Sequence, residues 1–132
     1  MIVVDASALV AIGGGEPEEE LYLGVIERAA RAVISPVNAV EAGVVLIGRQ
    51  RFASVEDFGL WLESLAVEVD TSPGDHAGAM AAYLEFGRGY HPAKLNLGDS
   101  FAYALAKSLD APLLYKGDDF ARTDIRSALQ PT

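Results

Sequence analysis

Acidic residues gather near the end of the chain, in the stretch LNLGDSFAYALAKSLDAPLLYKGDDFARTDI from residue 95 to residue 125. Asp99 stands at the head of a predicted helix, and Asp118, Asp119 and Asp124 follow a short apolar run. Carboxylates that lie close together repel one another, and as hard oxygen ligands they favour Mg²⁺ or Mn²⁺ over zinc. The pattern therefore indicates divalent-cation chemistry, provided that the fold brings such acids together.

Two acids outside this stretch join the candidate set. Asp5 directly follows the apolar run MIVV, and taken alone it is a typical helix cap or turn residue, as is Asp99. Glu41 differs, because at helical spacing it shares a face with Val37 and Val45, with Val44 beside them, and so interrupts an apolar stripe. An unpaired buried charge is costly, so we expect the Glu41 carboxylate to be paired, protonated or bound to a metal.

The elements that must position these acids alternate along the chain. The predicted strands are short and apolar, and they cover residues 1–4, 32–35, 67–69 and 112–115, with a last short strand near residue 125. The predicted helices cover about residues 17–30, 36–50, 54–66, 74–86 and 99–109, with Ser35 and Ser54 as caps. The inward face of the first of these helices is expected to consist of Leu21, Val25, Ile26 and Ala29. This alternation predicts βαβ units and an α/β fold, a three-layer α/β/α sandwich with a central, mainly parallel sheet.

The functional crevice of such a sheet lies beyond the carboxyl ends of its strands. Asp5 and the pair Asp118/Asp119 follow strands and fall at that edge, Asp99 begins a helix there, and Glu41 faces the sheet from a neighbouring helix. Two cations about 4 Å apart in such a site can activate a water and stabilise both the attacking and the leaving oxygen of a phosphodiester. We therefore expect a four-carboxylate metal site that hydrolyses phosphodiesters.

Length and composition limit the alternatives. The 132 residues, 51% hydrophobic and 22% charged, suit one ordinary domain over residues 1–132. With no cysteine, the chain has no disulfide, thiolate ligand or thiol nucleophile, which fits a reducing cytoplasm. Asp5 interrupts the N-terminal apolar run well short of the roughly 20 residues of a membrane span, so no membrane association is expected.

The net charge of −9 by itself counts against a nucleic-acid partner, because Lys and Arg lead phosphate binding. Two bound divalent cations would offset part of that charge at the site. The basic residues form spaced pairs that either line a groove or are simply solvated: Arg28/Arg31, Arg49/Arg51, Arg88/Lys94 and Arg122/Arg126. The two histidines, His76 and His91, have no partner at helical spacing and are expected at the surface.

The ordered set of motifs resembles a known family. MIVVDASALVA, SPVNAVEAGVVL, LNLGDSFAYALAKSLDAPLLYKGDDF and TDI are similar to the motifs of PIN-domain ribonucleases of the VapC toxin type, and the resemblance covers nearly the whole chain. It implies an Mg²⁺-dependent endoribonuclease, in which Mn²⁺ can substitute, acting on structured RNA. It also implies a homodimer that a cognate antitoxin inhibits.

The resemblance also assigns roles to the acids. Asp5 and Asp99 match the principal metal ligands, Glu41 matches the second acid, and the GDDF turn supplies the fourth. Many relatives carry Thr and Asn where this chain has Tyr115, Lys116 and Gly117, which leaves Asp118 and Asp119 both open as the fourth acid. We favour Asp119, directly before Phe120.

Two hydroxyl residues lie near the candidate acids in the sequence, and two other functions are compatible with the fold. Ser7 and Thr123 could hydrogen-bond metal ligands or a metal-bound water, although Ser7 also suits a helix start. An aspartyl-phosphate phosphotransferase or phosphatase would use Asp5 as its nucleophile, but such enzymes usually carry a second aspartate where this chain has Ser7. A non-catalytic protein-binding module would keep the fold without needing all four acidic positions.

Overall fold

A parallel β-sheet forms the centre of the computed structural model, which describes residues 1–72 and 76–129. Within these residues the sheet has four strands in the order β3-β2-β1-β4, all paired in parallel. The strands are β1 (Ile2–Val4), β2 (Ala32–Ile34), β3 (Val67–Val69) and β4 (Leu113–Leu114). The chain crosses from one sheet edge to the other between β3 and β4, so that β1 lies between β2 and β4.

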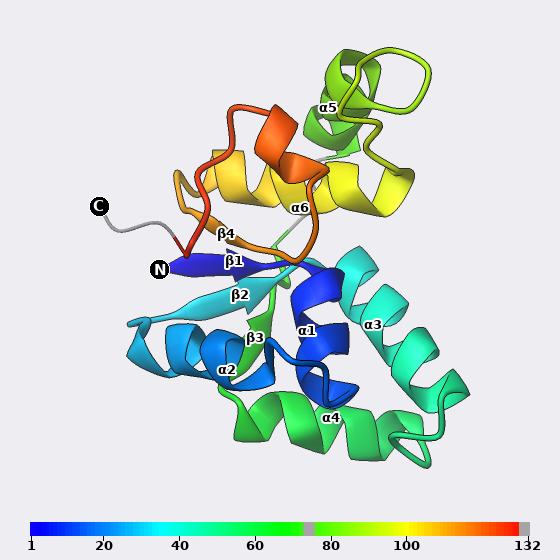
Figure 1. The fold of residues 1–132 in the computed structure, drawn as a ribbon, viewed down its shortest axis with the longest axis vertical. Coiled ribbons are helices and arrows are strands. Elements are labelled where there is room, and N and C mark those ends of the chain that lie inside the picture. The colour runs from blue at the N-terminus through cyan, green and yellow to red at the C-terminus, as the bar shows by residue number, and fades with distance from the viewer. Residues whose placement is uncertain (73–75, 130–132) are drawn as a thin grey trace.

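Helices cover both faces of this sheet (Figure 1). They are α1 (Ala6–Gly13), α2 (Glu19–Arg28), α3 (Pro36–Gly48), α4 (Val55–Ser64), α5 (His76–Phe86) and α6 (Leu97–Ser108), followed by the short 3₁₀ helix η1 (Phe120–Arg122). The pair α5 and α6 lies on one side, whereas α1, α2 and α4 lie on the other, and α3 contacts both α1 and α6. The predicted three-layer α/β/α sandwich is confirmed.

Strand side chains alternate between two cores. Val4 and Leu114 pack with the apolar residues of α1 to α4, whereas Val3 and Leu113 pack with those of α5 and α6. All four of these side chains are fully buried. Because helices cover both faces of β1, this strand is apolar at every position, which explains why MIVV shows no polar alternation.

The predicted strands at residues 1–4, 32–35, 67–69 and 112–115 are confirmed, as are both serine caps. Ser35 Oγ accepts a hydrogen bond from the Asn38 N–H at 3.0 Å, and Ser54 Oγ accepts one from the Asp57 N–H at 3.1 Å. These elements were predictable because a cap and an apolar run are local signals.

Three details of the prediction were wrong. The first helix is α1, which begins directly after Asp5, whereas Pro17 lies in a turn before α2. Leu21, expected to face inward, is 54% exposed, because α2 buries Tyr22 and Ile26 instead. No strand forms near residue 125 within the described residues; an isolated bridge joins Leu113 to Ser127.

The start of α6 also differs from the prediction. Asn96, and not a residue at the predicted start, caps this helix, and Asp99 occupies its third position. The predicted start of α5 at Gly74 lies outside the described residues. In the part of the chain that the structure describes, no helix combines the length and apolar character needed to cross a bilayer.

Candidate active site

Asp5 lies where β1 ends and α1 begins. Its Oδ2 accepts hydrogen bonds from the Ser7 N–H at 3.0 Å and the Ser7 hydroxyl at 2.6 Å, which caps α1. The Ser7 oxygen in turn accepts the Lys116 N–H at 2.9 Å, from the segment that follows β4. Asp5 is only 3% exposed, and among the described residues its Oδ1 has no hydrogen-bond partner. One carboxylate oxygen is therefore held in place while the other is free to bind a ligand.

Asp99 occupies the first turn of α6 in a reciprocal cap. Its Oδ2 accepts the Asn96 N–H at 3.0 Å, and its own N–H donates to Asn96 Oδ1 at 2.7 Å. Burial raises the pKa of the Asp99 carboxyl to about 7, against the lowering effect of the Asn96 bond. The negative charges of Asp5, Asp119 and Glu41 raise the pKa of Asp99 further, so each of these three acids lies close enough to repel its carboxylate.

Glu41 is half-buried on α3 and reaches across to the start of α6. Its Oε1 accepts a hydrogen bond from Asn38 Nδ2 at 2.8 Å. Its carboxylate lies so close to Gly98 that a Cβ at position 98 would overlap both of its oxygens. Burial raises the pKa of Glu41, the Asn38 bond lowers it, and the charge of Asp5 raises it further.

The predicted reason for the burial of Glu41 was wrong, although its inward position is confirmed. Val44, expected beside the acid on an apolar stripe, is 66% exposed. The buried face of α3 instead consists of Asn38, Ala39, Ala42, Gly43 and Leu46. Glu41 is half-buried because Gly98 leaves room for its carboxylate at the α3–α6 contact, which helical periodicity cannot show.

Asp118 and Asp119 both lie exposed in the turn after β4. Asp119 immediately precedes η1, and its charge raises the pKa of Asp5 and of Asp99. Asp119 therefore stands near the other acids, which favours it over Asp118 as the fourth member. Its role stays a prediction.

Asp5, Glu41, Asp99 and Asp119 thus come from four separate segments to one end of the sheet. The pKa values of Asp5, Glu41 and Asp99 are all raised, chiefly by burial and additionally by their neighbours' charges. Within residues 1–72 and 76–129, no three acidic or histidine side chains approach closely enough to enclose an ion as they stand. The donors are all carboxylate oxygens and one is buried without a partner, so the set fits a hard divalent cation.

The chain that carries this site is similar to known proteins over nearly its whole length. The family model described as PIN domain matches residues 2–126. The chain belongs to the PIN-domain family. It is 40% identical over 129 residues to Ribonuclease VapC42 of Mycobacterium tuberculosis, a match that covers 96% of this chain and 98% of that protein. It is also 38% identical over 125 residues to Ribonuclease VapC of Mycolicibacterium smegmatis, covering 94% and 97%.

A solved structure supports the same fold for this PIN domain. The crystal structure of VapC20 from Mycobacterium tuberculosis, described as a sarcin–ricin loop cleaving toxin, superposes with a TM-score of 0.75. The match covers 95% of this chain and 96% of that chain at 16% sequence identity. The family resemblance predicted from the ordered motifs is confirmed, and the relatives that match over nearly their full length are ribonucleases of the VapC type.

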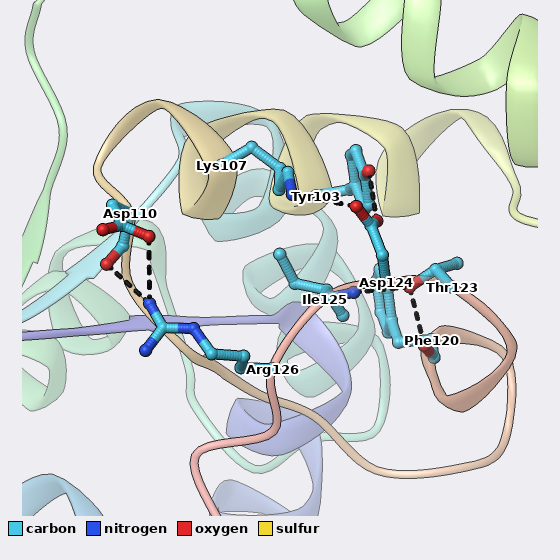
Figure 2. A network of polar contacts seen from close by, with 8 residues as sticks. All are labelled: Tyr103, Lys107, Asp110, Phe120, Thr123, Asp124, Ile125 and Arg126. Atoms are coloured by element: carbon cyan, nitrogen blue, oxygen red, sulfur yellow. Dashed lines mark hydrogen bonds and ion pairs between the residues drawn. The ribbon is translucent and has the colours of Figure 1, made fainter. Parts of the chain in front are cut away.

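Asp124, the remaining acid of the 95–125 stretch, has a different environment in this PIN domain. Figure 2 shows its carboxylate between the Tyr103 hydroxyl and the Lys107 ammonium of α6, with Lys107 Nζ at 2.9 Å. These contacts tie the C-terminal segment to α6. The Thr123 hydroxyl donates its hydrogen bond to the Phe120 carbonyl at 2.7 Å, which lies in the same turn and not among the candidate metal ligands.

The basic residues of the PIN domain are distributed over several ion pairs. Lys116 Nζ pairs with Glu16 and also lies 3.2 Å from Glu18 Oε1, beside the Asp5–Ser7 link. Three arginines of the spaced basic pairs have carboxylate partners: Arg31 with Glu68, Arg49 with Glu16, and Arg126 with Asp110. These pairings favour the solvated alternative for those three arginines.

The two histidines only partly follow expectation. His76 is exposed at the start of α5, but His91 is half-buried. The His91 ring packs edge-on against Phe86, and its Nδ1 accepts the Ala93 N–H at 3.0 Å. The prediction of a surface position was therefore wrong for His91, because a tertiary aromatic contact holds it.

Two residues of the site were missed from the sequence. Asn38 and Asn96 each stand three positions before a candidate acid, Glu41 and Asp99, and each hydrogen-bonds that acid or its backbone. The repeated Asn-x-x-acid spacing at two helix starts was a readable signal, because residues three apart share a helix face.

Proposed function

We propose that this PIN domain is an Mg²⁺-dependent endoribonuclease, with Mn²⁺ able to substitute, and the toxin component of a toxin–antitoxin pair. The observation that carries the proposal is the convergence of Asp5, Glu41, Asp99 and Asp119, whose charges influence one another across four separate segments. Its VapC relatives, named as ribonucleases and matched over nearly their full length, support the reaction class.

In this proposal Asp5 and Asp99 bind the first ion, and Glu41 and Asp119 complete its shell or recruit a second. The unpartnered Oδ1 of Asp5 supports that role, because a buried carboxylate oxygen without a donor is costly unless a cation binds it. A bound divalent cation supplies a Lewis acid that activates water and stabilises charge on phosphate oxygens.

The chain's own contribution is to hold the carboxylates in place. Ser7 orients Asp5 through its hydroxyl, and the Asn96 N–H holds one oxygen of Asp99. The amide of Asn38 holds Glu41. Hydrogen bonds thus hold the carboxylates of Asp5, Glu41 and Asp99 in place before an ion binds, which reduces the entropy lost when the site assembles.

The rival functions find less support. An aspartyl-phosphate enzyme needs a nucleophile that can reach phosphorus, but Asp5 is 3% exposed and one of its oxygens is bonded twice to Ser7. A non-catalytic binding module has no need for three acids with raised pKa values at one sheet edge. Neither rival accounts for the converging carboxylates.

The proposed substrate is structured RNA, and the proposed partners are a cognate antitoxin and a second copy of the chain, in the cytoplasm. Val40 and Val44 of α3 and Val55 of α4 are each more than 60% exposed. Exposed valines beside one another favour burial by a protein partner. Light scattering of the purified chain, with and without the antitoxin, tests the homodimer and the complex separately.

The decisive experiment compares cleavage of total RNA under matched conditions. The purified protein is expected to cleave with Mg²⁺ and to stop when EDTA removes the metal. Asp99→Asn should lower the rate more than about 100-fold, a larger loss than residues that only orient a ligand cause. Asp124→Asn is the matched control, because Asp124 pairs with Tyr103 and Lys107 and should leave cleavage unchanged.

Two outcomes would contradict the proposal. Equal cleavage with Mg²⁺, with EDTA and by Asp99→Asn would exclude a carboxylate metal site. Covalent phosphate found on Asp5 by mass spectrometry would favour the phosphotransferase instead.

A further inference from the structure

Asn38 is a fully buried polar residue at the contact between α3 and α6. Its Nδ2 donates to Glu41 Oε1 at 2.8 Å and to the Gly98 carbonyl at 2.9 Å. Its Oδ1 accepts from the Ser35 hydroxyl, and its N–H donates to Ser35 Oγ at 3.0 Å. The exposed fraction of Asn38 is 0%, so the bonds to Ser35 are buried, whereas those to Glu41 and Gly98 lie at the partly buried edge of the site.

The surroundings allow only one orientation of this amide. Both hydrogens of Nδ2 point at acceptors, namely a carboxylate and a backbone carbonyl. If the amide were turned over, its oxygen would face both acceptors, and the Glu41 carboxylate and the Gly98 carbonyl would lose this donor. The Ser35 cap of α3 thereby fixes the direction in which Asn38 donates to Glu41.

Glu41 depends on this donor. Within the described residues, the bond from Asn38 is the one hydrogen bond that the Glu41 side chain makes. A glutamate has three rotatable side-chain bonds, and an unrestrained one samples many positions. The Asn38 amide instead holds the carboxylate against Gly98, the residue that precedes Asp99 in the chain.

We propose that Asn38 is a positioning residue for the metal site, holding Glu41 in the place from which its carboxylate reaches the ion shared with Asp5 and Asp99. This inference rests on the proposed function. The same amide bonds α3 to the first turn of α6, so it sets the separation of Glu41 and Asp99 as well as the direction of Glu41.

The test is a double-mutant cycle read by Mn²⁺ binding in isothermal titration calorimetry. The variants are Asn38→Leu, Glu41→Gln and the two together, in the full chain. Asn38→Leu should weaken Mn²⁺ binding about 10–100-fold in the wild-type background. In the Glu41→Gln background, the same substitution should change the dissociation constant by no more than about twofold, because the positioned group is already gone.

The control separates positioning from general destabilisation. Ser54→Ala removes the cap of α4, which lies in another part of the fold, and should lower stability without weakening Mn²⁺ binding. Should Asn38→Leu fail to fold, as judged by circular dichroism, Asn38→Ala replaces it in the cycle, since alanine removes both donors without demanding space.

Each outcome of the cycle either supports or overturns the positioning role of Asn38. Unchanged Mn²⁺ binding in the Asn38 variant, or an equal loss in both backgrounds, would overturn the positioning role while leaving the proposed function intact. If the wild-type chain binds no Mn²⁺ at all, the proposed function itself fails, and the role of Asn38 fails with it. A loss confined to the wild-type background supports the inference.

Discussion

Asp5 uses its two carboxylate oxygens differently. Oδ2 accepts two hydrogen bonds from Ser7, which stabilise the charged form, whereas Oδ1 is buried and finds no partner within residues 1–72 and 76–129. Burial raises the pKa of Asp5 and the Ser7 bonds lower it, and burial prevails. Asp5 therefore caps α1 with Oδ2, while the buried Oδ1 is poorly solvated and would be stabilised by a bound cation.

Ser7→Ala tests this division at the residue scale. The substitution removes the hydroxyl that joins Asp5 to the Lys116 N–H, whereas the backbone N–H of residue 7 can still donate to Asp5 Oδ2, so Asp5 still caps α1. We expect the RNA cleavage rate to fall about 10–100-fold, with the free energy of unfolding lowered by only about 1 kcal/mol. Initial rates and urea melts measure the two effects.

Ser64→Ala serves as the control, because its hydroxyl bonds the Trp61 carbonyl at the exposed end of α4. Cleavage by Ser7→Ala at the wild-type rate would show that the hydroxyl does not orient Asp5 for catalysis.

At the scale of elements, the contact between α3 and α6 decides where Glu41 and Asp99 meet. Glycine at position 98 lets the Glu41 carboxylate lie against the backbone of the first turn of α6. The helix itself needs no glycine there, since its cap is made by Asn96 and Asp99. Gly98 therefore serves the approach of the two acids and not the formation of the helix.

Gly98→Ala tests the closeness of this approach. The new methyl group would overlap the Glu41 oxygens, which sit at the end of a flexible side chain and can swing away. We expect the free energy of unfolding to change by less than about 1 kcal/mol, while Mn²⁺ affinity falls about 10-fold or more. Calorimetric titration and urea melts give both values.

Gly59→Ala in α4 is the matched control, because among the described residues a Cβ there would meet no atom within 4 Å beyond its chain neighbours and its own helix backbone. It should stabilise the protein by about 0.5–1 kcal/mol, the usual gain from glycine to alanine within a helix, and leave Mn²⁺ binding unchanged. Unaltered Mn²⁺ affinity in Gly98→Ala would mean that Glu41 contributes nothing from its present position.

A second contact between elements joins the C-terminal segment to α6 (Figure 2). The hydrogen bond from Tyr103 and the bond and charge of Lys107 lower the pKa of Asp124. A lowered folded-state pKa contributes stability above the unfolded-state value of about 3.9, and that contribution is lost as the pH falls through the folded-state value. Asp124 is thus a structural acid, unlike the acids at the sheet edge.

Asp124→Asn should destabilise the protein at pH 7 by only about 0.5–1 kcal/mol, because Lys107 and Asp124 are largely exposed. The difference from wild type should shrink as the pH falls from about 4 through the lowered folded-state pKa, because wild-type Asp124 is neutral in both states once that value is passed. Urea melts across this range measure it. A constant difference at every pH would indicate a packing effect instead of a charge effect.

At the scale of the whole molecule, a chain with a net charge of −9 gathers several acids at one end of its sheet. Parallel strands place Asp5 after β1 and Asp119 after β4, and these two strands are neighbours. The raised pKa values of Asp5, Glu41 and Asp99 mean that this arrangement costs stability when the acids are charged. A divalent cation would offset that cost.

The metal-free protein should therefore lose stability as the pH rises. Asp99 has a pKa of about 7 in the fold, against about 3.9 in the unfolded chain, so between these values the folded state holds a proton that the unfolded state has released. Stability falls from about pH 4 to about pH 7 and then levels off. Thermal melts in EDTA should follow this course, and Asp99→Asn should flatten it.

Mg²⁺ should reverse the trend, because it competes with protons for the same oxygens. The rise in melting temperature on adding Mg²⁺ should be larger at pH 8 than at pH 5. An equal rise at both pH values would indicate that the ion binds elsewhere.

Sequence patterns alone determined the alternation of strands and helices, the caps at Ser35 and Ser54, and the candidate acids. Each of these depends on neighbours within a few positions, where apolar periodicity and side-chain caps act. The same local logic failed at α1, because the apolar MIVVDASALVA run contains a strand and a helix with only Asp5 between them.

Only the tertiary structure decided how the acids are held. The contact of Glu41 with Gly98, the donor role of Asn38, and the link from Asp5 through Ser7 to Lys116 all join segments that are far apart in the chain. Such contacts depend on how α3 and α6 pack and on which strands become neighbours in the sheet. No pattern within one segment encodes them, because a side chain's burial and partners are set by the element packed against it.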